Sequence, residues 1–532
     1  MTDPAQSAQT SPGLPEPNFI PPRDGLLILG LQLLLLVFRL GAVPLLGPDE
    51  PRYARVAIEM ARANEFVTPT LAGEPWLEKP PLYYWLAGLS YRVLGENEAA
   101  ARWPAVLAAL LLTGFSGAFA ARLFGATCGR LTMLVLATSP LLFAYSRAAT
   151  MDVLVAALIT GATAALLLSA LRISGPSAIP AAWVLMALAF LAKGPIGVLI
   201  PIGVAVLFAI LTRDRDIIRL VNGPGIFLWL LVAGAWVAAI LKDQGFRFIE
   251  VFILNHNLAR FTSTIHNHPG PIWYYVPVLI GGVLPWTAVL FAAPGAVARL
   301  KERARLALLA WISVPLTLFS LAGSKLPGYI LPCLPPLAIG VALGVRQLEA
   351  AKPGLNRVVG LPGVIMGAAA LAFAMRGFRE GEVWGRGALM PAAWFLAGAF
   401  LVSRILDRRP SEAPRLLTIT GAGLLLLLTL VAPPILDAVE SGRRLFIPAR
   451  GREVLVAGAW RTAWMAGYFY NDGKVRELGA DWRSEIATEI PGLVLFGPAE
   501  WRETEKAPGL VALKLSEGPR GTVLARISRK SP

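Results

Sequence analysis

Long apolar stretches with few charges alternate with short polar segments between residues 24 and 433. Most are close to the roughly 20 residues that an α-helix needs to cross a bilayer, so they predict about thirteen membrane-spanning helices. The fifth and sixth are short and meet at the sequence KGP, which predicts a tight helical pair. The predicted spans are residues 24–46, 102–122, 127–145, 151–171, 180–193, 196–211, 224–241, 273–297, 306–322, 327–345, 359–375, 389–403 and 415–433.

Composition supports the same class. The chain has 532 residues, of which 55% are hydrophobic and 16% charged, and its mean hydropathy is +0.60. Soluble domains carry about 25% charged residues, so we expect a polytopic α-helical membrane protein. The first apolar stretch is not expected to be a cleaved signal peptide, because it is long, follows the polar tail 1–23 and precedes further spans. Cys128 and Cys333 are too far apart to suggest a disulfide framework or a zinc site.

The positive charge of the chain, +15 overall, is concentrated on alternate loops, such as 299–305 and 404–415. By the positive-inside rule, these loops and the tail 1–23 face the cytoplasm. The net charge therefore indicates orientation rather than nucleic-acid binding. The opposite side receives the loops 47–101, 146–151, 193–195, 242–272, 323–327 and 376–388.

The segment 436–532 has a different pattern from the apolar segment 24–435. Short apolar runs predict strands at 453–458, 474–478 and 492–497, helices at 459–469 and 480–489, and a closing hairpin at 510–528. We expect a small soluble α/β domain, which an odd number of spans places outside the cytoplasm. It carries no P-loop, dinucleotide-binding or metal signature, and no internal repeat is evident in the chain, which disfavours a transporter.

The first outer loop opens with charged residues beside an apolar span. Residues 49–63 predict an amphipathic helix on the membrane surface, with Glu50 as its cap and Pro51 in its first turn. Asp49 and Arg52 are three residues apart and can face one cleft. Because one carboxylate is enough for a cap, Asp49 is a candidate for chemistry.

Further charges stand at the outer ends of other spans. Glu78 and Lys79 lie between aromatic residues and a double proline, where an interfacial aromatic belt is the alternative explanation. Asp152 lies at the entrance of the fourth span and is either a first-turn acid or a functional group, with Arg147 as its expected partner. Lys193 lies between two apolar helices, where it meets an anion or a carboxylate, or extends toward the membrane surface.

The loop 242–272 holds all three histidines, His256, His266 and His268. Their spacing is weak for a catalytic zinc site, and no neighbouring Cys or Asp completes one. His256 and Arg260 are four residues apart and would share a helical face suited to phosphate or sugar. Lys325 and Tyr329 follow on the same side of the membrane.

Cations and acids converging at the outer rim of an apolar bundle suit a lipid-linked anion, whose tail prefers the bundle and whose phosphate prefers lysine and arginine. A secondary transporter or lipid flippase is the alternative from another class. It predicts acidic residues near the bilayer midplane and repeated halves.

Six stretches carry a family resemblance, and they occur in order from Asp49 to Pro332. They are DEPRYA (49–54), EKPPLYYW (78–85), SRAATMDV (146–153), LAKGP (191–195), NHNLARFT (255–262) and GSKLPGYILP (323–332). On these motifs the chain resembles the lipid-carrier-dependent glycosyltransferases of the GT-C fold, in the protein O-mannosyltransferase-like superfamily. Within that superfamily it is most similar to the 4-amino-4-deoxy-L-arabinose lipid A transferases.

The resemblance implies inverting transfer of a sugar from a polyprenyl (undecaprenyl) phosphate, on the periplasmic side of the bacterial inner membrane. The acceptor would be a lipid A phosphate, another glycolipid, a core sugar or a protein. The resemblance places catalytic carboxylates at Asp49 and Asp152, and a possible divalent cation at Glu78. Donor-phosphate ligands are expected at Arg52, Lys79, Lys193 and Arg260, and the cavity lining at Tyr53, Glu78, Tyr83, His256, Lys325 and Tyr329.

Overall fold

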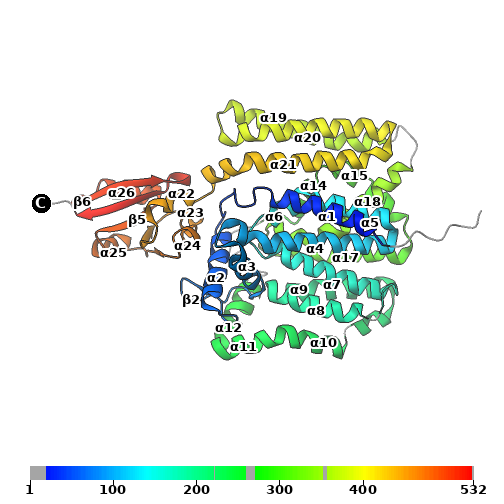
Figure 1. The fold of residues 1–532 in the computed structure, drawn as a ribbon, viewed down its shortest axis with the longest axis horizontal. Helices are drawn as coiled ribbons and strands as arrows, with labels where there is room; N and C mark the ends of the chain where they lie inside the picture. Colours follow the sequence, from blue (N-terminus) through cyan, green and yellow to red (C-terminus); the bar gives the residue numbers. More distant parts are fainter. Residues whose placement is uncertain (1–18, 176, 221, 259–269, 351–355, 530–532) are drawn as a thin grey trace, which may run out of the picture.

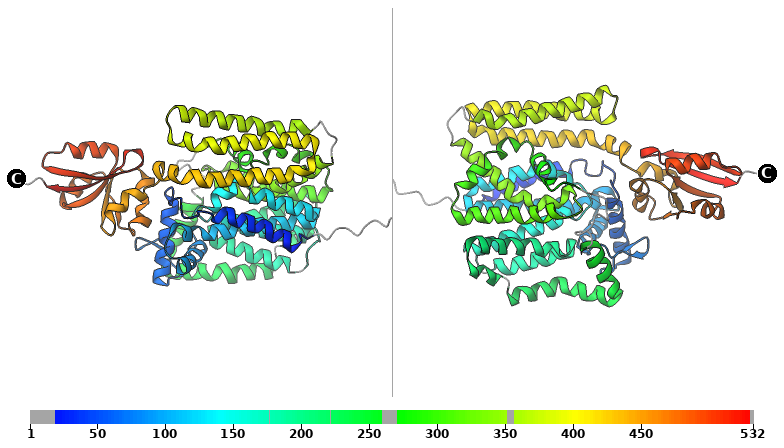
Figure 2. Two further views of the ribbon diagram at one scale, coloured as in Figure 1. Left: turned by 45° about the horizontal axis from the view of Figure 1, so that its top comes forward. Right: turned by 180° about the vertical axis from the view of Figure 1, so that it is seen from behind.

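The computed structural model describes residues 19–529, except 176, 221, 259–269 and 351–355. Its main part is a bundle of helices that run roughly parallel or antiparallel to one another, and a small unit containing a β-sheet lies beyond one end of the bundle (Figure 1). The same separation is visible from two further directions (Figure 2). The protein is a polytopic helical membrane protein, as the apolar pattern predicts.

Among the described residues, 8 helices are long and apolar enough to cross a membrane, or 9 if a bent pair counts as one span. The bent pair is α5 (Ala126–Ala137) and α6 (Pro140–Ser146), which meet at 59°. The single spans are α4 (Glu98–Phe124), α7 (Asp152–Ala170), α10–α11 (Gly223–Gln244), α17 (Glu302–Leu321), η4–α18 (Pro327–Glu349), and segments within α19 (Asn356–Arg379), α20 (Val383–Arg408) and α21 with the preceding turn (Pro410–Val439).

The predicted count of thirteen is therefore not confirmed, although each predicted span falls on helical structure. Three spans fall on shorter helices, α1 (Pro22–Val37), α8 (Ala178–Lys193) and α9 (Ile196–Thr212). The predicted span 273–297 is broken into α14 (Tyr275–Gly282), α15 (Thr287–Leu290) and α16 (Ala293–Ala298). Pro285 lies in the first break and Pro294 in the first turn of α16, just after the second. A proline cannot donate the backbone hydrogen bond that a continuous helix needs.

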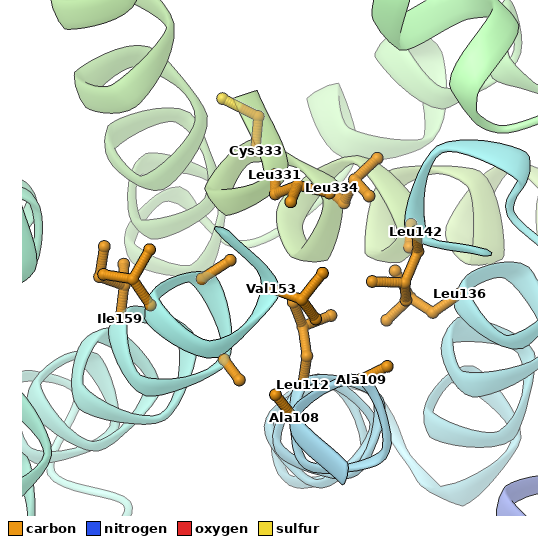
Figure 3. Packing of buried hydrophobic residues seen from close by; sticks show 14 of the residues in the cluster. Ala108, Ala109, Leu112, Leu136, Leu142, Val153, Ile159, Leu331, Cys333 and Leu334 are labelled. Atoms are coloured by element: carbon orange, nitrogen blue, oxygen red, sulfur yellow. The ribbon is translucent and has the colours of Figure 1, made fainter. Parts of the chain in front are cut away.

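Helix α7 lies at the centre of the bundle, and 89% of its most apolar 18-residue stretch is buried inside the protein. Val153 of α7, Leu112 of α4 and Leu334 of α18 meet in the core (Figure 3). Small residues allow neighbouring helices to approach closely. At Gly197 of α9, an added Cβ would lie 2.5 Å from the carbonyl carbon of Ala189 in α8. The two short helices therefore form the tight pair that the KGP sequence predicts.

The segment 47–97, between α1 and α4, folds against one end of the bundle (Figure 1). It consists of α2 (Asp49–Ala63), a two-stranded hairpin of β1 (Thr70–Leu71) and β2 (Glu74–Pro75), and α3 (Leu82–Leu94). The predicted amphipathic helix corresponds to α2, but its apolar face (Tyr53, Val56, Ala57 and Met60) is buried in the protein rather than left facing a membrane surface. The expectation that Glu50 caps this helix is wrong, because Pro48 is the N-cap residue and the helix already begins at Asp49.

The small unit follows α21 and contains a five-stranded sheet of order β4-β3-β5-β7-β6. Strand β3 pairs in parallel with β4 and β5, whereas β7 is antiparallel to β5 and β6. The strands are β3 (Val454–Ala457), β4 (Val475–Glu477), β5 (Gly492–Phe496), β6 (Leu510–Glu517) and β7 (Val523–Arg529), and the helices are α22 (Arg443–Phe446), α23 (Arg461–Met465), α24 (Gly467–Tyr470), α25 (Trp482–Thr488) and α26 (Pro498–Glu505).

Candidate active site

Asp152 and Lys193 meet because their helices are antiparallel neighbours. Asp152 is the first residue of α7 and Lys193 is the last residue of α8. The Lys193 ammonium forms an ion pair with Asp152, and both side chains keep a little exposure, 18% for Lys193 and 15% for Asp152. The same ammonium lies 4.8 Å from the centre of the Tyr329 ring. Three predicted site residues from three segments are thus brought together.

A tyrosine that sequence reasoning missed lies beside this group. Tyr145 packs against Gly328, where an added Cβ would lie 2.3 Å from the tyrosine ring. Gly328 thereby allows Tyr145 to lie next to the segment that carries Tyr329. The only sequence signal was its position directly before the SRAATMDV motif.

Asp49 and Arg52 form the second group, at the start of α2. Arg52 Nη2 donates to Asp49 Oδ1 at 2.5 Å, and Arg52 Nε donates to the Pro48 carbonyl at 2.8 Å. The guanidinium lies 5.1 Å from the centre of the Trp76 ring. Burial lowers the pKa of Arg52, but the neighbouring charges of Asp49 and Glu78 outweigh burial and leave it above its usual value. Arg52 is therefore a fixed cation that is held on one side by protein groups.

Lys79 and Glu78 lie next to this second group. Lys79 is buried and its ammonium donates to the Glu78 carbonyl at 3.2 Å. The Glu78 side chain is half-buried and close enough to Arg52 to raise the arginine's pKa. Tyr53 is buried next to Arg52 in sequence, and its ring centre lies 6.4 Å from that of Tyr83.

Tyr83 itself is a core residue. It is fully buried, and its hydroxyl donates to the Ala101 carbonyl at 2.9 Å. It therefore attaches α3 to α4.

Glu50 and Arg102 connect the two groups, and sequence reasoning missed their pairing. Arg102 is 1% exposed and donates to Glu50 at 3.0 Å and to the carbonyls of Leu40, Val43 and Pro44. Glu50 also accepts the backbone N–H of Ala149 at 3.0 Å. Ala149 stands three residues before Asp152. This buried pair therefore fixes the start of α2, which carries Asp49, against the loop that leads into α7.

The expectation that Arg147 pairs with Asp152 is wrong. Arg147 instead donates to the carbonyls of Leu36, Phe38 and Arg39, at 2.5, 2.9 and 3.0 Å. These carbonyls follow or end α1, where a helix leaves acceptors without intrahelical donors. Arg147 thus satisfies the end of the first helix.

The remaining predicted residues are placed less fully. Lys325 is buried and donates to the Ala322 carbonyl at 2.7 Å. The backbone of His256 belongs to the π-helical segment η3 (Ile249–Leu258), but its side chain is not described. Arg260, His266 and His268 lie outside the described residues. Within residues 19–529, apart from the gaps named above, no group of three or more His, Cys, Asp and Glu side chains could hold a metal ion.

Comparison with known proteins gives the motifs a context. A family model described as dolichyl-phosphate-mannose-protein mannosyltransferase matches residues 78–243. The undecaprenyl phosphate-alpha-4-amino-4-deoxy-L-arabinose arabinosyl transferase of Edwardsiella ictaluri is 32% identical over 346 residues, which are 62% of this chain and 62% of that protein. The enzyme of the same name from an Enterobacter species is 32% identical over 356 residues, 64% of this chain and 62% of that protein. The chain thus spans about three fifths of the length of these relatives.

The structural comparison extends further along the chain. The crystal structure of ArnT from Cupriavidus metallidurans bound to undecaprenyl phosphate superimposes with a TM-score of 0.74 at 22% identity, covering 94% of this chain and 97% of that one. The resemblance that the motifs indicate is therefore confirmed: the chain has the GT-C fold and is similar in sequence to the undecaprenyl phosphate–aminoarabinose transferases.

Proposed function

We propose that the protein is an inverting glycosyltransferase that moves a sugar from undecaprenyl phosphate to an acceptor in the cell envelope. The first candidate for the sugar is 4-amino-4-deoxy-L-arabinose, as in the names of the relatives, and the first candidate for the acceptor is a lipid A phosphate. The observation that carries the proposal is the joining of Asp49–Arg52 to Asp152–Lys193 through the Glu50–Ala149 hydrogen bond.

The cations would act on the leaving group. As the glycosidic bond breaks, negative charge accumulates on the undecaprenyl phosphate. Arg52, Lys79 and Lys193 would stabilise that charge more than they stabilise the bound donor, which is the condition for lowering the barrier. Arg52 and Lys193 are already paired with carboxylates, so a bound phosphate would share or displace these partners. Arg260 is proposed as a further ligand from its motif.

The carboxylates would act on the other side of the reacting carbon. Asp49 or Asp152 would stabilise the oxocarbenium-like centre that forms in the transition state. An acceptor phosphate is already an anion and needs little base catalysis. An acceptor hydroxyl would need one of the two aspartates to take its proton. Partial exposure suits both aspartates for contact with a substrate, and 40% of the Asp49 side chain is exposed.

The location of the charges favours an enzyme over a transporter. Asp152 and Lys193 are terminal residues of their helices, whereas a transport site is expected near the bilayer midplane. We propose thirteen crossings of the bacterial inner membrane, with residues 1–23 in the cytoplasm, and the loop 47–101 and the domain 436–532 in the periplasm. This orientation is supported by the basic alternate loops.

A divalent cation, if one binds, would neutralise part of the donor phosphate's charge. Glu78 is the residue that would hold it. Its half-buried carboxylate, which lies near Arg52, would supply one protein ligand to the cation. The described residues supply no further carboxylate or histidine to complete a set of three.

The test compares envelope glycolipids by mass spectrometry in cells with the gene, without it, and with Asp152→Asn in its place. We expect lipid A to gain an aminopentose only with the intact gene. A gain of a hexuronic acid or a hexose would change the sugar. An unchanged glycolipid profile would contradict the lipid acceptor and favour a protein acceptor, which the mannosyltransferase family model supports as the second candidate.

A further inference from the structure

The C-terminal unit contacts the helix that carries Asp49 and Arg52. A turn between α24 and β4 consists of Asn471, Asp472 and Gly473. Asn471 is buried and its side-chain amide donates to the carbonyls of Arg452 and Lys474, at 2.9 Å each, which fixes the turn. Asp472 protrudes from it with φ +56°, in the left-handed region.

Asp472 contacts two arginines of α2. Its carboxylate forms an ion pair with Arg55 and another with Arg62, the latter at 3.1 Å. Arg55 is mostly buried, with 12% of its side chain exposed, and an added Cβ at Gly473 would lie 3.3 Å from its Nε. Arg55 is thus in contact with both the carboxylate and the backbone of the turn, whereas Arg62 forms only the exposed ion pair.

Arg55 continues the contact to the first-loop hairpin. Its Nε donates to Glu59 Oε1 at 2.6 Å. Glu59 accepts from the Thr70 hydroxyl at 2.8 Å and from the backbone N–H groups of Ala72 and Gly73, at 2.9 and 3.2 Å. One carboxylate therefore fixes the first strand and the turn of the hairpin to α2.

The hairpin leads directly into the segment that carries the proposed donor ligands. Trp76 N–H donates to the Pro69 carbonyl at 2.7 Å, which closes the hairpin. The Trp76 ring lies under the Arg52 guanidinium, and its Nε1 donates to the Tyr84 hydroxyl at 3.1 Å. Lys79 follows three residues later. The position of Arg52 and Lys79 relative to each other thus depends on this hairpin.

A second contact supports the start of the same helix. The Tyr470 hydroxyl accepts the N–H of Leu45 at 2.8 Å and donates to Glu98 at 3.1 Å. Leu45 belongs to the short connection before Asp49. The C-terminal unit therefore contacts the residues that precede α2, the middle of α2 at Arg55, and its last turn at Arg62.

We infer that the turn 471–473 is a positioning element for the donor side of the active site, and that Asp472 acts through Arg55 and Glu59. The inference rests on the proposed function, because it assigns the C-terminal unit a role in placing the donor ligands. In a different role, which the test below distinguishes from this one, the C-terminal unit would bind the acceptor. Asp472 and Arg55 are positioning residues and touch no reacting atom.

The test uses the full chain in detergent or nanodiscs with Asp472→Asn. Asparagine tolerates the left-handed conformation at least as well as aspartate, so this substitution removes the charge and preserves the turn. We expect kcat/KM for the undecaprenyl-linked donor to fall by about fivefold, through a higher KM and a lower kcat, which is as much as the loss of a partly exposed ion pair can produce. The KM for the acceptor should not change.

Two variants sharpen the result. Arg55→Gln should give a kinetic change at least as large, because it also removes the bond to Glu59. Adding Asp472→Asn to Arg55→Gln should cost little more, since Asp472 acts mainly through Arg55. Glu503→Gln is the matched control, since it removes an exposed ion pair with Arg483 elsewhere in the same unit. This control should leave all kinetic constants unchanged.

Other results would overturn the inference. A rise in the acceptor KM alone would mean that the C-terminal unit grips the acceptor. Unchanged kinetics per folded molecule with a lower melting temperature would mean that the turn is merely structural. Binding of undecaprenyl phosphate, measured without turnover, separates this inference from the proposed function. Equal Kd values for the wild type and Asp472→Asn overturn the inference alone, whereas no binding by the wild type overturns the proposed function.

Discussion

Asp49 and Glu50 are neighbours in sequence, yet the structure uses them in opposite ways. Glu50 faces inward, is 9% exposed, and accepts from Arg102 and from the backbone N–H groups of Ala149 and Leu46. Asp49 faces the exposed end of the bundle, is 40% exposed, and pairs with Arg52. A carboxylate surrounded by protein donors serves the fold, whereas one with exposed oxygens can still contact a substrate.

The same contrast separates the ion pairs at this end of the bundle. Glu50–Arg102 is almost completely buried and joins segments that are distant in sequence. Asp152–Lys193 is also well shielded, but both of its side chains retain some exposure next to an aromatic ring. We therefore expect the first pair to determine stability and the second to determine activity.

The largest effect should come from separating the buried pair. Arg102→Met leaves Glu50 as a buried charge without its cation, and leaves the carbonyls of residues 40–44 without a donor. Removing one partner of a buried pair destabilises a protein by about 3–5 kcal/mol. Thermal unfolding and the yield of folded protein in detergent should both fall sharply. A variant that folds as well as the wild type would remove the distinction between the two pairs.

The next effect should appear in activity without a comparable loss of folding. Asp49→Asn and Asp152→Asn should each lower kcat by about 10²–10⁴-fold, the range typical of a carboxylate that acts at a reacting centre. Asp49→Asn should change the melting temperature little, because its side chain is exposed. Single-turnover transfer assays with purified protein measure the loss. If only one variant loses activity, the other aspartate holds Arg52 or Lys193 rather than acting on the sugar.

The contrast also explains which parts the sequence could predict. Asp152 and Lys193 could be predicted from the sequence, because residues at the ends of neighbouring spans meet when the helices are antiparallel. The strands of the C-terminal unit could also be predicted, because each is a short apolar run between turn residues. The partners of Glu50 and Arg147 could not be predicted, because their hydrogen bonds join segments about 50 to 110 residues apart in sequence. The breaks in 273–297 show that an apolar run does not by itself determine helical continuity.

A smaller effect should follow from losing one phosphate ligand. Lys79→Met removes a charged donor and retains most of the buried hydrocarbon chain. Hydrogen bonds to charged groups are worth about 1.5–3 kcal/mol, which corresponds to a rise of about 10–100-fold in the donor KM. Titration of the purified protein with undecaprenyl phosphate should show a matching loss of affinity. The matched control is Lys514→Met, which removes an exposed ion pair with Glu517 in the C-terminal unit and should leave the affinity unchanged.

The smallest effect concerns pH at Asp472. Partial burial raises the pKa of Asp472, but hydrogen bonds and charges from Arg55 and Arg62 outweigh it and hold the pKa below the usual 3.8. A carboxyl group with a lowered pKa stabilises the fold above its unfolded pKa, and that contribution is lost as the pH falls through the folded pKa. Because 52% of the Asp472 side chain is exposed, the contribution should be only about 0.2–1 kcal/mol. The difference in melting temperature between the wild type and Asp472→Asn should therefore stay constant from about pH 8 to 5 and shrink only below about pH 4. A difference that varied near neutral pH would place another titrating group at the contact between the C-terminal unit and α2, and would make Asp472 a less direct control of the donor site.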